Sequence, residues 1–426
     1  MHKNAMSAAP EAQKVLVAGT TADYIQWIRH ACPGQALFLT APHIRKNAQE
    51  APPDPSEELV RPLSDLPDIM SALAAHLEKY SQKLTGVACF DCESMVTAAL
   101  IAENLRLVYP DVTAVQNCRN KLVSKQLWQA REILCPRVWP VRCPEDVIRQ
   151  LADVTAGLVL KPAAGSGSEL VFHCRNRAEA HKAWDTLAAG LEKRKQNPLF
   201  ALPHRLILAE ERICGPEYSC DFILTPDRLT LVRLARKIVP AGLPFGTAAG
   251  YAVPGVLPLG MSMASLTGQM EKAARTLGIH TGMCMVDFVV KDNQAYFIEM
   301  TPRPGGDCLP QLLMAAANLD IIKLALDVAA DLPWHLDDIQ FTPHMGIRIH
   351  AKKSGMLTAV DSRNLDSDPR VKQLHLIRKP GHIITMPPAD YDSWLLGHMI
   401  INTEGWNFPE TRAMLLARRL EIAIQS

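Results

Sequence analysis

Four side chains that could bind a metal ion together with a phosphate group lie close together in segment 285–306, MVDFVVKDNQAYFIEMTPRPGG. They are Asp287, Glu299, Thr301 and Arg303. Oxygen ligands suit Mg²⁺, which takes one or two carboxylates and completes its coordination with water and phosphate oxygens. Arg303 would add a forked donor for phosphate or an oxyanion. The plain alternative is a surface hairpin whose charged side chains are only solvated.

The order of apolar and turn residues predicts that this segment folds as an antiparallel hairpin. Runs 285–290 and 295–300 are rich in Val, Phe, Tyr and Ile around a polar Lys-Asp-Asn-Gln turn. A three-residue loop would place Asp287 opposite Glu299, whereas a two-residue loop at 292–293 would send them to opposite faces. The sequence leaves both loops open. Two facing carboxylates repel each other and are costly to bury, so a cation is expected between them.

Upstream of the hairpin, residues 14–116 alternate apolar strands with amphipathic helices. Helices are expected near 23–30, 68–83 and 93–107, with the strand-like runs KVLVAG, ALFLT and GVACF before and between them. This alternation predicts a parallel, doubly wound sheet that binds ligands at the carboxyl ends of its strands. After the first strand, Gly19 stands alone where a dinucleotide fingerprint needs three glycines, which argues against an NAD-type dehydrogenase.

The rest of the chain mixes strands and helices. A helix is expected over 117–138 until Pro136 stops it, and further helices near 265–277, 309–330 and 409–423. Between the helix over 117–138 and the helix near 265–277, the pattern of segment 157–224 predicts two strands, a helix and two more strands. The expected fold class is therefore α/β and α+β.

Length and composition narrow the function classes. A chain of 426 residues exceeds one core, and a net charge of +1 does not suggest a nucleic-acid partner. No apolar run reaches the roughly 18 residues that span a bilayer, and the N-terminal segment lacks a signal-peptide pattern. A soluble, cytoplasmic protein without a membrane partner is expected. The 11 cysteines lack framework spacing, so reduced, buried thiols are favoured over redox chemistry at Cys89 and Cys92.

Three further segments carry residues suited to a nucleotide. Lys161 ends the strand GLVLKP and precedes the Gly/Ser loop 163–168, whose backbone N–H groups could cradle phosphates. Lys121 lies upstream and could converge on the same phosphates. Segment 210–219, EERICGPEYS, predicts a hinge between two strands where a purine and its ribose could bind. Each of these features also has a plain alternative. The Gly/Ser loop could be an ordinary tight hairpin, Lys121 a solvated helix lysine, and segment 210–219 an exposed strand end.

Taken in order, these motifs resemble the ATP-grasp superfamily, and specifically its L-amino-acid (carboxylate–amine) ligase branch. The shared pattern is a helix lysine, a strand Lys-Pro with a Gly/Ser loop, E-x-x-I-x-G-x-E, and a D-F hairpin leading into E-x-T-P-R. The resemblance covers residues 116–330, and the flanking segments look like the family's Rossmann-like N-terminal domain and small C-terminal lobe. It implies domains at 1–115, at 116–340 with a mobile lid over 157–210, and at 341–426.

The resemblance also implies roles for single residues. ATP binding would involve Lys121, Lys161, Gly165, Ser166, Gly167, Ser168, Glu210, Glu211, Ile213 and Glu217. Asp287, Glu299 and Thr301 would hold Mg²⁺, or Mn²⁺ in its place, and Arg303 would be catalytic by stabilising the transferred phosphoryl group. The family usually has Asn at the position of Thr301. The threonine hydroxyl is shorter, so it would reach a second metal only through water.

Substrate contacts are expected on both sides of this centre, at Arg236, Lys237, Gly305 and Gly306. The alternative for the two cations is a solvated strand end. Asp91 and Glu93 could add substrate contacts from the first domain, but capping of the helix they precede is favoured. The histidines, including His280, His344 and His350, show no metal spacing and are interpreted as structural.

These residues predict activation of a carboxylate by ATP. The carboxylate would attack the γ-phosphate, and an amine would capture the resulting acyl phosphate. The expected partners are a small-molecule carboxylate and amine, and the relatives' habit of forming dimers suggests a homodimer. Three alternatives remain open: a biotin-dependent carboxylase subunit, a nucleotide-binding protein without catalysis, and a dehydrogenase.

Overall fold

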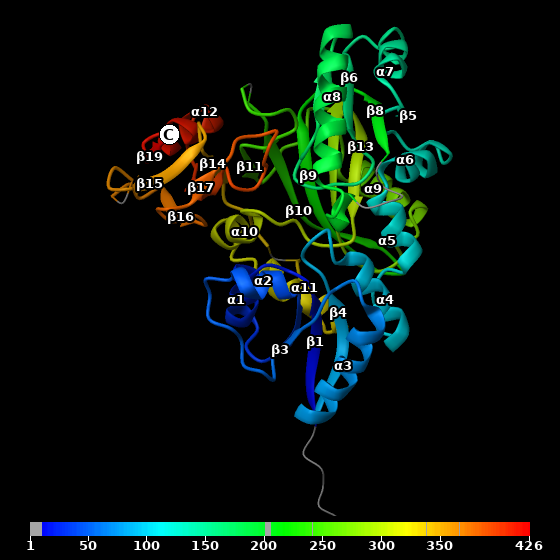
Figure 1. Cartoon of the computed structure of the whole chain (residues 1–426), viewed down its shortest axis with the longest axis vertical. Coiled ribbons are helices and arrows are strands. Elements are labelled where there is room, and N and C mark those ends of the chain that lie inside the picture. Colours follow the sequence, from blue (N-terminus) through cyan, green and yellow to red (C-terminus); the bar gives the residue numbers. More distant parts are fainter. Residues whose placement is uncertain (1–10, 201–205, 241, 338, 366) are drawn as a thin grey trace, which may run out of the picture. The chain divides into compact units, whose positions relative to one another are not determined.

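The computed structural model describes residues 11–200, 206–240, 242–337, 339–365 and 367–426 (Figure 1). The chain divides into two compact units. The first comprises Met1–Val112 and Ile322–Trp334, and the second Thr113–Ile321 and His335–Ser426. Within the described residues, no helix combines the length and apolarity needed to cross a bilayer.

The first unit is built on a four-stranded parallel sheet. Its strands are β1 (Ala12–Ala18), β2 (Ala36–Thr40), β3 (Glu58–Val60) and β4 (Gln82–Ala88), in the order β3-β2-β1-β4. Its helices are α1 (Ala22–Ala31), α2 (Pro42–Asn47), α3 (Leu66–Tyr80), α4 (Met95–Leu105) and most of α11 (Ile321–Ala329). A side chain at Gly86 would lie 1.8 Å from the Ala329 carbonyl oxygen, so this glycine lets α11 end against β4. The predicted Rossmann-like parallel sheet is confirmed.

The second unit contains a small antiparallel sheet of order β5-β8-β6-β7. Its elements are β5 (Val138–Val141), α7 (Pro144–Leu151), β6 (Leu158–Pro162), β7 (Phe172–Cys174), α8 (Arg177–Lys193), the 3-10 turn Pro198–Phe200 and β8 (Ile207–Glu211). Helices α5 (Val112–Arg119) and α6 (Lys121–Gln129) precede it. The small sheet carries the predicted Gly/Ser loop between β6 and β7.

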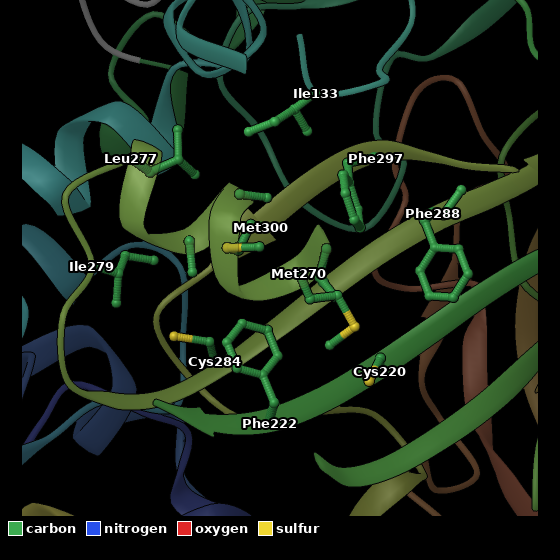
Figure 2. Packing of buried hydrophobic residues seen from close by; sticks show 14 of the residues in the cluster. Ile133, Cys220, Phe222, Met270, Leu277, Ile279, Cys284, Phe288, Phe297 and Met300 are labelled. Carbon is green, nitrogen blue, oxygen red and sulfur yellow. The ribbon is translucent and has the colours of Figure 1, made fainter. Parts of the chain in front are cut away.

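An eight-stranded sheet forms the centre of the second unit, in the order β13-β12-β9-β10-β11-β14-β18-β16. Its strands are β9 (Glu217–Leu224), β10 (Leu229–Ile238), β11 (Gly250–Val253), β12 (Gly282–Lys291), β13 (Gln294–Thr301), β14 (His344–His350), β16 (Val371–Leu376) and β18 (Leu395–Asn402). Apolar side chains such as Phe222 and Phe288 pack with Met270 of α9 (Met263–Thr276) in the core shown in Figure 2. Because side chains alternate along a strand, the opposite face is left to Asp221, Asp287 and other polar residues.

The remaining elements are α10 (Leu309–Ala317), α12 (Pro409–Ala417) and a three-stranded sheet of β15 (Gly355–Asp361), β17 (Ile383–Ile384) and β19 (Glu421–Gln425). The three-stranded sheet and α12 enclose a second apolar core with β14 and β18. These two strands belong to the eight-stranded sheet and not to a separate one. The division into three domains therefore stays a prediction.

Four predicted helices have different ends in the structure. Segment 117–138 holds the end of α5 and all of α6, with no helix beyond Gln129. The two helices are separate because Asn120 starts α6 by accepting the N–H groups of two of its residues. Segment 309–330 is broken at Asn318, which has a left-handed φ of 51°. The helix expected over 68–83 stops at Tyr80 and gives way to β4, and the last helix stops at Ala417 and gives way to β19.

Candidate functional site

The predicted metal ligands lie on the hairpin of β12 and β13, which closes through a two-residue turn. Asp292 and Asn293 form the turn with φ of 51° and 58°, the left-handed conformation that such a tight turn requires. This turn alone would put Asp287 and Glu299 on opposite faces, yet they are directly paired. The ladder shifts by one residue beside Asp287, so that Ile298 lacks an opposite residue and forms a β-bulge. The bulge, which neither predicted loop included, restores the facing pair.

Asp287 is held by a lysine at the end of β10. The Nζ atom of Lys237 lies 2.9 Å from Asp287 Oδ2 and 3.7 Å from Glu217 Oε2. Burial alone would lower the pKa of Lys237, but these two carboxylates raise it, so the lysine stays charged. Asp287 Oδ1, in contrast, is buried and has no hydrogen-bond partner among the described residues. Asp287 therefore keeps one oxygen for another cation.

Glu299 connects the hairpin to the Gly/Ser loop through a lysine at the start of α6. Lys121 Nζ lies 3.1 Å from Glu299 Oε2 and donates to the Gly165 carbonyl oxygen at 3.2 Å. Burial alone would raise the pKa of Glu299. The positive charges of three lysines, Lys121 first among them, outweigh burial and lower this pKa to about 2. Glu299 is therefore a carboxylate at all physiological pH values.

Glu210 at the end of β8 is enclosed by two lysines. Lys161 Nζ lies 2.7 Å from Glu210 Oε2, and Lys125 Nζ lies 3.0 Å from Glu210 Oε1. Burial would raise the pKa of Glu210, but the two lysines lower it. Burial also lowers the pKa of Lys161, to about 8, and the charges of Lys125 and Lys121 act in the same direction. The side chain of Glu210 is thus a counter-ion for the predicted phosphate-binding lysine.

Lys125 is a site residue that sequence reasoning missed. It lies one helical turn after Lys121, and its side chain is fully buried. Its Nζ also donates a hydrogen bond of 2.7 Å to the carbonyl oxygen of the bulged Ile298. The available signal was its spacing, because residues at i, i+4 and i+7 share one helix face, and buried Trp128 occupies i+7.

The Gly/Ser loop lies between β6 and β7, next to Lys121. It contains the predicted phosphate-binding residues Gly165, Ser166, Gly167 and Ser168. Ser168 has a left-handed φ of 59°, and its Oγ donates to the Gly246 carbonyl oxygen at 2.7 Å. A side chain at Gly246 would lie 3.2 Å from that Oγ, so only a small residue allows the contact. The loop is thereby tied to the segment that follows Lys237.

A pocket of about 570 Å³ lies beside the predicted hinge. Four predicted residues line it: Ile213, Glu217, Arg236 and Lys237. Residues of α12 line it as well, among them Thr411 and Met414. Its volume falls within the usual range for small-molecule sites. The pocket therefore joins the nucleotide-binding and substrate-binding residues that the sequence predicted.

Two of the predicted residues have side chains paired near the surface. Glu211 Oε2 lies 2.8 Å from Arg137 Nε, and Arg236 Nε lies 3.4 Å from Glu410 Oε1. Ion pairs at such exposed positions contribute little stability. A ligand could therefore replace Glu410 as the partner of Arg236 at small cost.

Arg303 begins a loop that a buried ion pair fixes in place. Arg233 donates to both carboxylate oxygens of Asp221, at 2.7 and 3.1 Å. Asp221 Oδ1 also accepts the N–H of Gly305 at 3.0 Å. A side chain at Gly305 would lie 2.4 Å from Arg233 Nη2, so this position needs glycine. The Gly305 amide is already bound, which leaves Gly306 as the partly exposed glycine of the predicted substrate pair.

Beyond this loop, Asp307 forms an ion pair that sequence reasoning did not predict. Arg348 Nε on β14 lies 2.7 Å from Asp307 Oδ2, and Arg348 Nη1 donates to the Ala248 carbonyl oxygen at 3.1 Å. Burial and the negative charge of Asp307 raise the pKa of Tyr251, which pairs with Gly346 on β14. No sequence motif marks Arg348, because its role depends on the pairing of β14 with β11.

The residues present fit a magnesium ion held in part by the nucleotide. Asp287 Oδ1 and Thr301 Oγ1 are both buried without a hydrogen-bond partner among the described residues, and Thr301 is 8% exposed. Within the same part of the chain, no group of three or more His, Cys, Asp or Glu side chains could form an all-protein metal site. Magnesium is typically bound by one or two carboxylates, with the rest of its ligands from water and phosphate.

The remaining candidates from the sequence have structural surroundings. Asp91 accepts hydrogen bonds from the Ser94 N–H at 2.7 Å and the Ser94 Oγ at 3.0 Å, as a residue ahead of a helix does. Cys89 and Cys92 are buried, and the Sγ of Cys89 donates a hydrogen bond of 3.2 Å to the Asp91 carbonyl oxygen. His344 is 3% exposed and its ring contacts Thr342. These surroundings match the structural interpretations of the sequence analysis.

Comparison with known protein families identifies one domain of the chain. Residues 154–311 match the ATP-grasp domain family, and the parallel sheet that precedes them has a Rossmann-like arrangement. The predicted resemblance and fold class are confirmed.

Solved structures share this architecture over nearly the whole chain. The L-amino acid ligase from Bacillus licheniformis matches with a TM-score of 0.74 and 19% identity, covering 98% of this chain and 100% of that one. The biotin carboxylase domain of the Hydrogenobacter thermophilus 2-oxoglutarate carboxylase, in complex with MgADP and bicarbonate, matches with a TM-score of 0.67 and 17% identity. It covers 98% of this chain and 92% of that one. At these identities the likeness establishes the fold alone.

Two curated proteins are also similar in sequence. Uncharacterized protein y4rH of Sinorhizobium fredii (strain NBRC 101917 / NGR234) is 24% identical over 286 residues, 67% of this chain. Carnosine synthase 1 of Homo sapiens is 22% identical over 260 residues, 59% of this chain. The match spans only 57% and 31% of the lengths of these two relatives.

Proposed function

We propose that the chain is an ATP-dependent carboxylate–amine ligase that forms an amide or peptide bond through an acyl phosphate. The observation that carries the proposal is the presence of two ion pairs, Lys121 with Glu299 and Lys161 with Glu210, beside the Gly/Ser loop. The likeness to an L-amino acid ligase and to carnosine synthase 1 supports amide formation as the reaction class.

In this proposal the nucleotide lies between the small sheet and the polar face of the eight-stranded sheet. Lys121 and Lys161 leave their carboxylate partners to bind phosphate oxygens, with the N–H groups of the Gly/Ser loop beside them. The adenosine occupies the pocket at the hinge, where Ile213 offers backbone groups and Glu217 offers a carboxylate to the ribose. Loop closure through Ser168 and Gly246 keeps water from the intermediate.

The reaction then needs positioning and charge neutralisation more than covalent chemistry by the protein. A carboxylate oxygen of the first substrate bonds to the γ-phosphorus while the bond from that phosphorus to the β,γ-bridging oxygen breaks, and ADP leaves. The amine nitrogen of the second substrate bonds to the acyl carbon, loses a proton, and the carbon–oxygen bond to phosphate breaks. Arg303 stabilises the negative charge on the phosphoryl group in transfer.

Mg²⁺, when bound by Asp287, Glu299 and Thr301, would neutralise the oxygens of the β- and γ-phosphates. In the nucleotide-bound state, Lys237 would then give up Asp287 and become available to a substrate carboxylate, as the sequence analysis expected. Asp307 and Arg348 place opposite charges beyond Arg303, an arrangement that suits a zwitterionic amino acid.

The test is an ADP-release assay with a matrix of amino acids and small carboxylic acids, followed by mass spectrometry of the product. We expect ADP release that needs both a carboxylate and an amine, and a product equal in mass to the two substrates minus water. ADP release that needs bicarbonate and biotin would instead favour a carboxylase, and ATP binding without turnover a non-catalytic protein. Size-exclusion chromatography with light scattering checks the expected homodimer.

A further inference from the structure

The β-bulge in β13 has its own hydrogen-bond donor. A bulge leaves the extra residue outside the regular ladder, and β13 is the edge strand of its sheet, so the Ile298 carbonyl needs a partner from elsewhere. Lys125 Nζ supplies one at 2.7 Å. On the same open edge, the N–H of Phe297 donates to the Leu134 carbonyl oxygen at 2.9 Å. The edge is therefore covered at the bulge by α6 and at the preceding residue by the segment that follows α6.

A fully buried ammonium group needs a counter-ion as well as this one carbonyl. Glu210 provides it at 3.0 Å, although Glu210 is also 2.7 Å from Lys161. The two lysines differ in place: Lys161 precedes the Gly/Ser loop, whereas Lys125 lies at 0% exposure against β13. When Lys161 turns to a phosphate, Lys125 still neutralises Glu210, so no buried carboxylate is left unpaired.

We propose that Lys125 is a positioning residue, which fixes the bulge at Ile298 and so keeps Asp287 opposite Glu299. The inference rests on the proposed function, because the facing carboxylates matter only if they bind a metal. Without this bond, the hairpin is free to take the regular pairing of a two-residue turn, in which the two carboxylates lie on opposite faces. Lys125 acts through Ile298 and touches neither nucleotide nor metal.

The test is the Lys125→Met variant, which keeps the length of the side chain and removes the donor and the charge. Lys272→Met is the matched control, since Lys272 is an exposed lysine on α9 of the same unit. Three quantities are measured: ADP affinity without metal, Mn²⁺ affinity of the ADP complex by electron paramagnetic resonance, and amide hydrogen exchange of residues 294–301. None of them depends on turnover.

For Lys125→Met we expect Mn²⁺ binding weakened about 10- to 100-fold, as when a group that orients metal ligands is lost. Hydrogen exchange in β13 should accelerate. Metal-free ADP affinity should fall as well, because Glu210 then has Lys161 as its remaining lysine partner, so Mn²⁺ affinity is measured at saturating ADP. Lys272→Met should match wild type in all three. Mn²⁺ affinity unchanged in a folded Lys125→Met protein would overturn the role of Lys125 alone, whereas wild-type protein that binds no Mn²⁺ with ADP would overturn the proposed function too.

A second variant tests the inference if Lys125→Met does not fold. Lys125→Gln keeps an N–H donor for Ile298 without the charge, so we expect slow exchange in β13 and Mn²⁺ affinity near that of wild type. A folded Lys125→Gln protein with ordered β13 and lost Mn²⁺ binding would show that the bulge does not set the metal site. That outcome would overturn the inference.

Discussion

Lys121 Nζ lies 3.1 Å from Glu299 Oε2, so a lysine expected to bind phosphate is paired with a carboxylate expected to bind the metal. The contact joins the start of α6 to the end of β13. The residue predicted to bind phosphate and the residue predicted to bind the metal are therefore in direct contact.

Replacing Glu299 by Gln is expected to abolish magnesium-dependent ADP formation while the fold is retained. The amide keeps the shape but lacks the charge that both Lys121 and a metal require. Steady-state ADP release measures activity, and circular dichroism with thermal unfolding checks the fold. Wild-type turnover in this variant would refute the metal role.

Replacing Arg303 by Ala should lower kcat by about 10²- to 10³-fold, the usual cost of losing a donor to developing charge. ATP affinity should change little, because the guanidinium acts mainly on the phosphoryl group in transfer. Equilibrium ATP binding and single-turnover rates separate the two effects. Equal losses in both would reassign Arg303 to ground-state binding.

The pH dependence of kcat/KM for ATP should follow the protonation of Lys161, whose pKa is lowered to about 8. Nucleotide phosphates favour the protonated lysine, so kcat/KM for ATP is expected to be full below this pH. Above it, kcat/KM should fall by up to about tenfold per pH unit as the free enzyme loses the proton. Lys161→Arg, whose guanidinium stays charged, should flatten this decline even if its overall activity is lower. An unchanged profile in that variant would assign the decline to another group.

Thr301→Val tests whether the unpartnered hydroxyl serves the metal. The two side chains have nearly the same shape, and Thr301 Oγ1 is buried without a hydrogen-bond partner among the described residues, so stability should be kept or rise. The Mg²⁺ concentration that gives half-maximal activity should increase several-fold. Thr301→Asn, which restores the residue usual in the family, is the companion variant and should not raise it. An unaltered Mg²⁺ requirement in Thr301→Val would remove Thr301 from the site.

Gly305→Ala should destabilise the protein by about 1–3 kcal/mol, the usual cost of overpacking. Its Cβ would lie 2.4 Å from Arg233 Nη2 and 2.7 Å from Leu309 Cδ1. Gly268→Ala is the control in which the carbon added to a helix glycine meets open space. It should stabilise the protein by about 0.5–1 kcal/mol. Chemical denaturation measures both, and equal effects would contradict the packing argument.

The sequence predicted those parts of the fold that depend on local pattern. Alternating strands and helices located the parallel sheet, and the motif order located Lys161, Asp287 and Glu299 on their elements. Helix ends were less predictable. Asn120 looks like an ordinary helix residue until its side chain is seen to accept two N–H groups and start α6. At Asn318, a left-handed residue separates two helices whose apolar pattern is continuous.

The rules for hairpin register could not predict that Asp287 lies opposite Glu299. Those rules relate register to loop length, and the turn does have two residues, which would separate the two carboxylates. The opposite result comes from Ile298, whose carbonyl oxygen finds a donor in Lys125, 173 positions earlier in the chain. Contacts this distant in sequence leave no local pattern. The same reason hid Arg348, whose partner Asp307 lies on a different element.

Four lysines and four carboxylates form the ion pairs of this site, namely Lys121, Lys125, Lys161 and Lys237 with Glu210, Glu217, Asp287 and Glu299. Such a site is close to electroneutral before any ligand enters. A bare polyphosphate would meet as much repulsion as attraction there, whereas a polyphosphate that arrives with its divalent cation carries two fewer negative charges into the site. Association should therefore depend only weakly on ionic strength and favour the preformed cation–nucleotide complex over its separate components.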